Sequence, residues 1–222
     1  AGVVISASHN HYNDNGVKFF DDNGCKISTA LQDAIEVKLN ARNAISQTSD
    51  IGKAKSYEEA TRQYIDFCQS IFNLLNNACN LKIVIDCANG ANYSIANQVF
   101  TELGINVILI NNTPDGYNIN LNCGVLDTNN LKNVMVENKA NLGIAFDGDG
   151  DRVLMIDEKG ELVEGDELIF IIAKYLQANN KLTANAVVGT KMSNIGMRES
   201  LKNLNIEFIE ADIGDRFVIA KM

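Results

Sequence analysis

The sequence predicts an α/β protein built from successive units in which strands and helices alternate. Short apolar runs at 82–86, 106–110 and 142–146 alternate with segments whose apolar side chains recur at helical spacing. An acidic, glycine-containing turn at 147–152 directly follows the third run, the position where open α/β sheets place their ligands. A second series of the same rhythm begins near residue 158. This alternation favours βαβ connections and mostly parallel sheets.

The first unit, residues 1–50, is expected to contain two short sheet elements and one helix. An apolar run at 3–5 leads into a serine-containing turn and predicts a short strand. Residues 17–27 predict a hairpin, because two apolar runs flank an Asp-Asn-Gly turn. Residues 30–44 repeat apolar side chains at helical spacing and predict a helix.

The second unit, residues 56–157, is expected to open with a long helix to about residue 76, because Ser56 and Glu59 have the spacing of a capping box. Its remaining strands and helices alternate and are expected at 82–86, 94–103, 106–110, 128–138, 142–146 and 153–157. The third unit, residues 158–222, continues the alternation with elements at 166–178, 186–189, 194–203 and 207–210.

Residues 147–152, which read Asp-Gly-Asp-Gly-Asp-Arg, predict a metal site. The two glycines let the backbone curl until the carboxylates of Asp147, Asp149 and Asp151 converge. Converging carboxylates repel one another unless a cation lies between them, and oxygen ligands suit Mg²⁺ better than a soft metal. Arg152 adds a fixed positive charge, and a metal beside a guanidinium is suited to binding a phosphoryl group.

The acidic loop has three other interpretations. A solvated acidic turn does not account for such tight spacing after an apolar strand. An EF-hand loop requires glycine at its sixth position, where this chain has Arg152, and residues 153–156 indicate a strand. A haloacid-dehalogenase-like phosphatase would use Asp147 as its nucleophile, but it leaves Asp151 and Arg152 unexplained. That phosphatase stays as an alternative.

A second motif, Ser-Ala-Ser-His-Asn at residues 6–10, follows the first strand. Together with the acidic loop it resembles the α-D-phosphohexomutase superfamily, whose active-site serine lies in a Ser-His-Asn segment and whose metal loop reads Asp-Gly-Asp-Gly-Asp-Arg. Residues 14–20, 86–91 and 118–120 are similar to the bacterial phosphoglucosamine mutase branch in particular. The resemblance extends along essentially the whole chain, and it implies repeated three-layer α/β domains with mixed, mostly parallel sheets.

The resemblance also implies a reaction, in which glucosamine 6-phosphate and glucosamine 1-phosphate interconvert through a phosphoserine enzyme and a sugar bisphosphate. Ser8 would carry the phosphoryl group, with Ser6 as the competing hydroxyl, and Ser8 would join the three aspartates in binding Mg²⁺. The other implied site residues are three near the phosphoryl group, Arg152, Lys18 and His9, and one that contacts substrate, Arg216. The family has proline where this chain has His11, and proline would stiffen the loop.

Within the resemblance, residues 1–50 correspond to the end of a first α/β domain carrying the phosphoserine loop. Residues 56–157 correspond to a second domain carrying the metal loop, and residues 158–222 to an incomplete third domain. The sequence lacks the superfamily's sugar-recognition loop and its carboxyl-terminal phosphate-binding domain, so we expect a fragment of a longer protein. A phosphomannomutase or phosphoglucomutase of the same superfamily, and a non-catalytic metal-binding interaction module, stay open as alternatives.

Composition narrows the choice of partners. A net charge of −9 and a pI near 4.7 argue against nucleic acid or an anionic membrane as a partner. An acidic protein that binds an anionic substrate must concentrate positive charge locally, which Lys18, Arg152, Arg216 and the metal could provide. No apolar run reaches the length of a transmembrane helix. Five cysteines without metal-binding spacing are expected to be reduced thiols of a cytoplasmic protein. Whether the protein forms a homodimer is left open.

Overall fold

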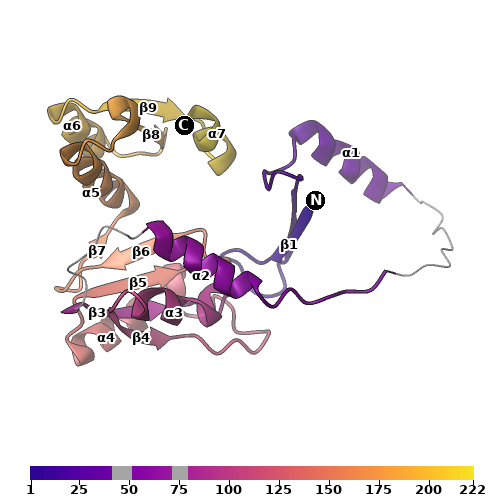
Figure 1. Ribbon diagram of the computed structural model, residues 1–222, viewed down its shortest axis with the longest axis horizontal. Helices are drawn as coiled ribbons and strands as arrows, with labels where there is room; N and C mark the ends of the chain where they lie inside the picture. Colours follow the sequence, from indigo (N-terminus) through magenta and orange to yellow (C-terminus); the bar gives the residue numbers. More distant parts are fainter. Residues whose placement is uncertain (42–51, 72–79) are drawn as a thin grey trace.

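The computed structural model describes residues 1–41, 52–71 and 80–222, which form three groups of elements (Figure 1). In the first group, two strands pair antiparallel, with Gly2 opposite Phe20 and Ser6 opposite Gly16, and a helix follows them. The elements of this group are β1 (Gly2–Ser6), β2 (Gly16–Phe20) and α1 (Thr29–Asn40). Among the helices in the described ranges, none is long and apolar enough to cross a membrane.

The second group is built on a five-stranded mixed sheet with the order β4-β3-β5-β6-β7. The three strands β4, β3 and β5 are parallel, whereas β6 and β7 join antiparallel. The strands and helices of this group are α2 (Ala60–Ile71), β3 (Lys82–Asp86), α3 (Ala96–Thr101), β4 (Asn106–Ile110), α4 (Asn129–Asn138), β5 (Leu142–Phe146), β6 (Val153–Ile156) and β7 (Leu162–Val163). Two short 3₁₀ turns, η2 (Ala91–Ser94) and η3 (Gly124–Leu126), lie in its loops.

Helices cover both faces of this sheet. Successive side chains of β3 point to opposite faces, so Ile83 and Ile85 pack with Ala96 of α3, whereas Val84 packs with Leu131 and Met135 of α4. Helix α2 contacts α3 and extends the layer on that face. The second group therefore has the three-layer α/β architecture that the sequence predicts.

The third group is a smaller α/β unit in which β8 and β9 pair in parallel. Its core joins Val187 of β8 to Ala173 of α5 and to Met197 and Leu201 of α6. Helix α7 contacts both strands, and Figure 1 shows it on the side of this group that faces α1. The elements are α5 (Gly165–Ala178), η4 (Thr183–Asn185), β8 (Ala186–Thr190), α6 (Ile195–Asn203), β9 (Glu207–Ala211) and α7 (Asp215–Lys221).

The predicted hairpin over 17–27 forms in part. The chain turns back after β2, with one antiparallel bridge between Phe20 and Lys26 and backbone hydrogen bonds from Asp21 N to Cys25 O at 2.8 Å and from Ile27 N to Phe19 O at 3.4 Å. The prediction did not include the main partner of β2, which is β1 along the whole length of both strands. A strand has two edges, so Phe20 lies opposite Gly2 on one side and opposite Lys26 on the other.

Two helix predictions need correction as well. Helix α2 begins at Ala60 rather than at Ser56, and Glu59 supplies the first accepting carbonyl, to Gln63 N at 3.0 Å, so the expected capping box does not form. The helix expected over 94–103 is shorter, because α3 covers Ala96–Thr101 and Ser94 belongs to the preceding 3₁₀ turn η2. The carboxyl-terminal ends of the helices predicted over 30–44 and 56–76 lie outside the described residues.

The carboxyl ends of β3 and β5 lie next to each other, and the chain leaves them in opposite directions, toward β4 and toward β6. This is the switch point at which open α/β sheets bind ligands. The loop after β3 packs directly on the loop after β5, because Ala91 N donates to Gly148 O at 2.8 Å. A Cβ atom on Gly90 would lie 2.2 Å from that same oxygen, so only glycine fits there.

We expect Gly90→Ala to destabilise the fold by roughly 1–3 kcal/mol, because the added methyl group would overlap backbone atoms that a side-chain rotation cannot move. The backbone of Gly90 has φ −107°, which alanine tolerates, so the effect is steric. Chemical denaturation measures the change. Gly165→Ala at the start of α5 is the matched control, since its Cβ would meet nothing within 4 Å. Equal stability of the two variants would contradict the close packing of these loops.

Candidate functional site

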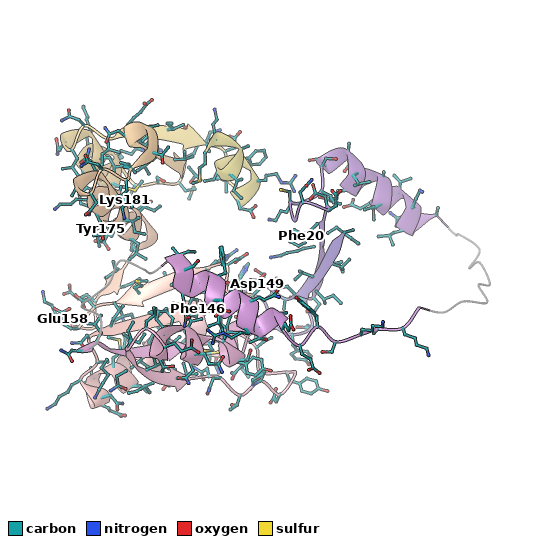
Figure 2. All side chains as sticks on the ribbon, in the orientation of Figure 1. Phe20, Phe146, Asp149, Glu158, Tyr175 and Lys181 are labelled. Atoms are coloured by element: carbon teal, nitrogen blue, oxygen red, sulfur yellow. The ribbon has the colours of Figure 1, made fainter. Side chains whose placement is uncertain are left out.

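Three carboxylates converge where β5 ends. Asp147, Asp149 and Asp151 each offer one oxygen, and these oxygens all lie within 4.8 Å of one another. Asp147 is fully buried, while Asp151 is exposed. Figure 2 shows Asp149 between the five-stranded sheet and the β1–β2 ribbon. The acidic loop therefore faces the first group of elements, and the predicted convergence of the three aspartates is confirmed.

Two of the carboxylate oxygens in this triad lack a donor. Asp147 Oδ2 and Asp149 Oδ1 are buried and have no hydrogen-bond partner among the described residues, whereas Asp147 Oδ1 accepts from Arg152 N at 3.1 Å. A buried carboxylate oxygen without a partner is costly, and a cation placed between the carboxylates removes that cost. The triad can therefore bind a metal, and its all-oxygen donor set fits a hard divalent cation.

The three carboxylates differ in their electrostatics. Burial raises the pKa of Asp147, and the charges of Asp149 and Asp151 raise it further. The hydrogen bond from Arg152 N acts in the opposite direction but does not outweigh them. Burial also acts to raise the pKa of Asp149, but hydrogen bonds from Lys18 and Ser6 outweigh it, so that pKa is lowered. A nearby cation favours the charged form of a carboxylate, so a bound metal would lower the pKa of both Asp147 and Asp149.

Lys18 comes to the triad from strand β2. Its Nζ lies 2.6 Å from Asp149 Oδ2 and 3.5 Å from Asp151 Oδ2. The pairing of β2 with β1 fixes the location of Lys18 along the ribbon, where it lies opposite Val4 and two residues from the pair of Ser6 and Gly16. The hydrogen bond to Asp149 raises the pKa of Lys18, so the side chain is held as a cation.

The two serines of the first motif have different contacts. Ser6 Oγ donates to Asp149 Oδ2 at 2.9 Å and accepts from Ser8 N at 2.8 Å. Ser8 has φ 51° in the left-handed region, and its Oγ lies 3.4 Å from His9 Nδ1. Within the described part of the chain, the Ser8 hydroxyl makes no hydrogen bond to the triad, so its assignment as a metal ligand stays a prediction. The direct contact of Ser6 with the triad was not predicted, since Ser6 ends β1 and its partner Asp149 is 143 residues away in the chain.

The two arginines predicted for the site lie apart from each other. Arg152 is exposed, and among the described residues its guanidinium has no hydrogen-bond or ion-pair partner. Arg216 of α7 donates to Thr29 Oγ1 at 3.0 Å, and Lys26 pairs with its neighbour Asp215, so α7 is attached to the beginning of α1. A groove of about 320 Å³ between these elements is lined by Lys18 and Arg216 among others. Arg216 therefore shares a groove with Lys18 but does not contact the triad.

Sequence reasoning missed one buried polar residue of this region. Asn120 is only 4% exposed, and its side-chain amide donates to the backbone carbonyls of Ser8 and Asn10, both at 2.8 Å. The local sequence carries no signal for this role, because Asn120 and Ser8 are 112 residues apart in the chain.

Comparison with known families matches three consecutive parts of the chain to the phosphoglucomutase/phosphomannomutase alpha/beta/alpha domains. Residues 1–46 match domain I, residues 62–160 match domain II and residues 164–222 match domain III. A solved structure of a phosphoglucomutase/phosphomannomutase family protein from Burkholderia thailandensis has the same fold, with a TM-score of 0.77 and 23% identity over 99% of this chain and 46% of that one.

Curated relatives are similar over the full 222 residues. The phosphoglucosamine mutase of Ruthia magnifica subsp. Calyptogena magnifica is 60% identical over 223 aligned residues, and that of Psychromonas ingrahamii is 49% identical over 222. The match covers 100% of this chain and 50% of each relative, so the chain spans about half the length of the curated relatives it matches. On the family matches and these identities together, the chain belongs to the phosphoglucomutase/phosphomannomutase family.

Proposed function

We propose that this chain carries the phosphoryl-transfer machinery of a phosphohexomutase that interconverts glucosamine 6-phosphate and glucosamine 1-phosphate. The observation that carries the proposal is the acidic triad, which packs against the serine motif and Lys18 and has two buried oxygens without a donor in the described part of the chain. The choice of an amino sugar among hexose phosphates is supported by the 60% identity to a phosphoglucosamine mutase.

In this proposal Ser8 stores the phosphoryl group. Each half-reaction exchanges one phosphate ester for another. The bond from phosphorus to Ser8 Oγ breaks as a bond from phosphorus to a sugar hydroxyl forms, and the hydroxyl proton ends on Ser8 Oγ. The resulting sugar bisphosphate returns its other phosphate to Ser8 by the reverse exchange. Because serine is a weak nucleophile unaided, both directions require positive charge around the transferred group.

The residues around Ser8 supply that charge. Mg²⁺ held by Asp147, Asp149, Asp151 and Ser8 or its phosphate would neutralise charge on the phosphoryl oxygens. Lys18 is held protonated by its carboxylate partners, so it contributes a positive charge and can donate a proton rather than accept one. Arg152 and His9 are proposed to bind phosphoryl oxygens, and Arg216 to bind substrate from the groove that it shares with Lys18.

The alternatives differ in where a covalent phosphate would lie. A haloacid-dehalogenase-like phosphatase would form an aspartyl phosphate on Asp147, but the complete burial of Asp147 favours a ligand over a nucleophile. An interaction module would bind metal and carry no phosphate. The related phosphomannomutases and phosphoglucomutases would share the transfer machinery and differ in the sugar. A cytoplasmic location is part of our proposal and is supported by the buried, free thiols of Cys87 and Cys123.

The first test concerns the metal. We expect Asp149→Asn to weaken Mg²⁺ binding at least tenfold, about 1.4 kcal/mol, because it removes one of three ligand charges. Isothermal titration calorimetry on this chain with MgCl₂ measures the affinity. Asp157→Asn is the matched control, since Asp157 accepts hydrogen bonds in the turn after β6, outside the triad. Unchanged Mg²⁺ affinity in Asp149→Asn would exclude the triad as the metal site.

The second test concerns the nucleophile. In the full-length protein we expect Ser8→Gly to lower mutase turnover by roughly three orders of magnitude or more, because the hydroxyl that stores the phosphoryl group is gone. Glycine is the appropriate replacement because Ser8 has φ 51°, a conformation in which alanine would be strained.

Phosphopeptide mapping after incubation with a hexose bisphosphate locates the covalent phosphate in this test. We expect it on Ser8 in the unsubstituted protein and still on Ser8 in the control Ser6→Ala, which retains the Ser8 hydroxyl and loses the hydrogen bonds that Ser6 Oγ makes with Asp149 and with Ser8 N. Phosphate on Ser6 would show that the wrong hydroxyl was chosen. An aspartyl phosphate on Asp147 would support the phosphatase, and metal binding without any phosphate would support the interaction module.

A further inference from the structure

Asn120 contacts the Ser8 loop from the second group of elements. It lies in the loop between β4 and η3, and its Nδ2 donates to Ser8 O and to Asn10 O, both at 2.8 Å. Both partners are carbonyl oxygens, so the amide nitrogen rather than the amide oxygen must face them. The residue has φ 57°, a left-handed conformation that asparagine adopts more readily than most side chains. Both amide hydrogens are therefore used to hold one loop.

The backbone of Asn120 is itself fixed. Its N–H donates to Ala88 O at 2.9 Å, and Ala88 N donates to the fully buried carboxylate of Asp86 at 2.9 Å. The other oxygen of Asp86 accepts from Gly124 N at 2.9 Å and from Asn111 Nδ2 at 3.0 Å. One carboxylate thus joins the loops that follow β3 and β4 to the segment after Asn120, which makes a rigid support for the Asn120 amide.

The Ser8 carbonyl lies between this amide and the acidic loop. A Cβ atom built on Gly148 would lie 2.4 Å from Ser8 O and 2.7 Å from Asn120 Nδ2. A second contact joins the Ser8 loop to the loop of Asn120, because the rings of Tyr12 and Tyr117 meet edge to face with centroids 5.1 Å apart. The peptide groups on both sides of Ser8 are then held, the N–H by Ser6 Oγ and the C=O by Asn120 Nδ2.

We propose that Asn120 is a positioning residue that holds the Ser8 loop against the acidic loop and so fixes the location of Ser8 Oγ relative to the triad. The catalytic part of this inference rests on the proposed function. Among the described residues the Ser8 hydroxyl makes one long contact, 3.4 Å to His9 Nδ1, so its location depends on its backbone. A residue that gives one phosphoryl group to the sugar and then receives the other from the bisphosphate needs one fixed location, and small displacements of reacting atoms are costly in rate.

The test substitutes Asn120 by glycine in the full-length protein. Glycine retains the left-handed backbone and removes both donors. Asn122→Gly is the matched control, because Asn122 lies two residues away, also has a left-handed backbone (φ 51°) and is exposed. Asn120→Asp is a second variant without added backbone freedom, since it retains the side-chain shape but places a carboxylate oxygen against the two carbonyls.

Two measurements follow for each variant. Hydrogen exchange with mass spectrometry should show faster exchange of the peptide that covers residues 7–12 in both Asn120 variants and not in Asn122→Gly. Steady-state kinetics with glucosamine 6-phosphate should show kcat reduced roughly 10- to 100-fold with KM changed less than about threefold, because positioning acts on the transferred group rather than on sugar binding.

The outcomes separate the inference from the proposed function. Exchange of residues 7–12 and kcat both within twofold of the control in the Asn120 variants would overturn the positioning role. A raised KM with unchanged kcat would also overturn it, since that pattern reports lost substrate binding. A third outcome is possible in which the unsubstituted full-length protein shows no mutase turnover, while exchange of residues 7–12 is faster in the Asn120 variants alone. That outcome would support the positioning of Ser8 and overturn the proposed reaction instead.

Discussion

The arrangement of the site depends on the mutual repulsion of three carboxylates held at the end of β5. Oxygens of Asp147, Asp149 and Asp151 lie within 4.8 Å of one another, and two buried oxygens in this set have no donor among the described residues. Charges this close are unfavourable at low dielectric unless positive charge is added. Lys18 and the Ser6 hydroxyl relieve part of the repulsion by contacting Asp149. The remaining unpaired oxygens make the loop suited to bind a cation, which a fully salt-bridged turn would not be.

The site is divided between groups of elements that are distant in sequence. The triad belongs to the five-stranded sheet, whereas Ser6, Ser8 and Lys18 come from β1, β2 and the loop between them. Buried amides and one buried carboxylate, Asp86, connect the loops at the carboxyl edge of the sheet and so determine where the serine motif can lie. Polar groups of this kind are costly when unsatisfied, so a fully paired network permits one arrangement and penalises the others.

The sequence predicts some parts of this structure to the residue and others not at all. Strands 82–86, 106–110 and 142–146 are correct at both ends, because buried apolar runs define them. The hairpin at β2 forms only in part, and the pairing of β2 with β1 was not predicted, because a strand pattern indicates a strand but not its partner. The aspartate triad could be predicted, since its members are adjacent in sequence. The contacts of Ser6 and Asn120 could not, since they join residues 143 and 112 apart. The boundaries of the three units and the chemical roles of Ser8, Arg152, His9 and Arg216 stay predictions.

The antiparallel return of the chain from β5 into β6 has a consequence for how an anion is recognised here. In many α/β sheets a helix follows the strand, and its free N–H groups and dipole bind phosphate directly. In this chain the acidic loop leads into strand β6, and among the described residues the only backbone N–H donated to a carboxylate of the triad is that of Arg152. The acidic loop therefore does not lead into a helix whose amino terminus could bind the anion. A phosphate ester would be attracted here through cations and basic side chains, so its affinity should depend strongly on metal concentration and ionic strength.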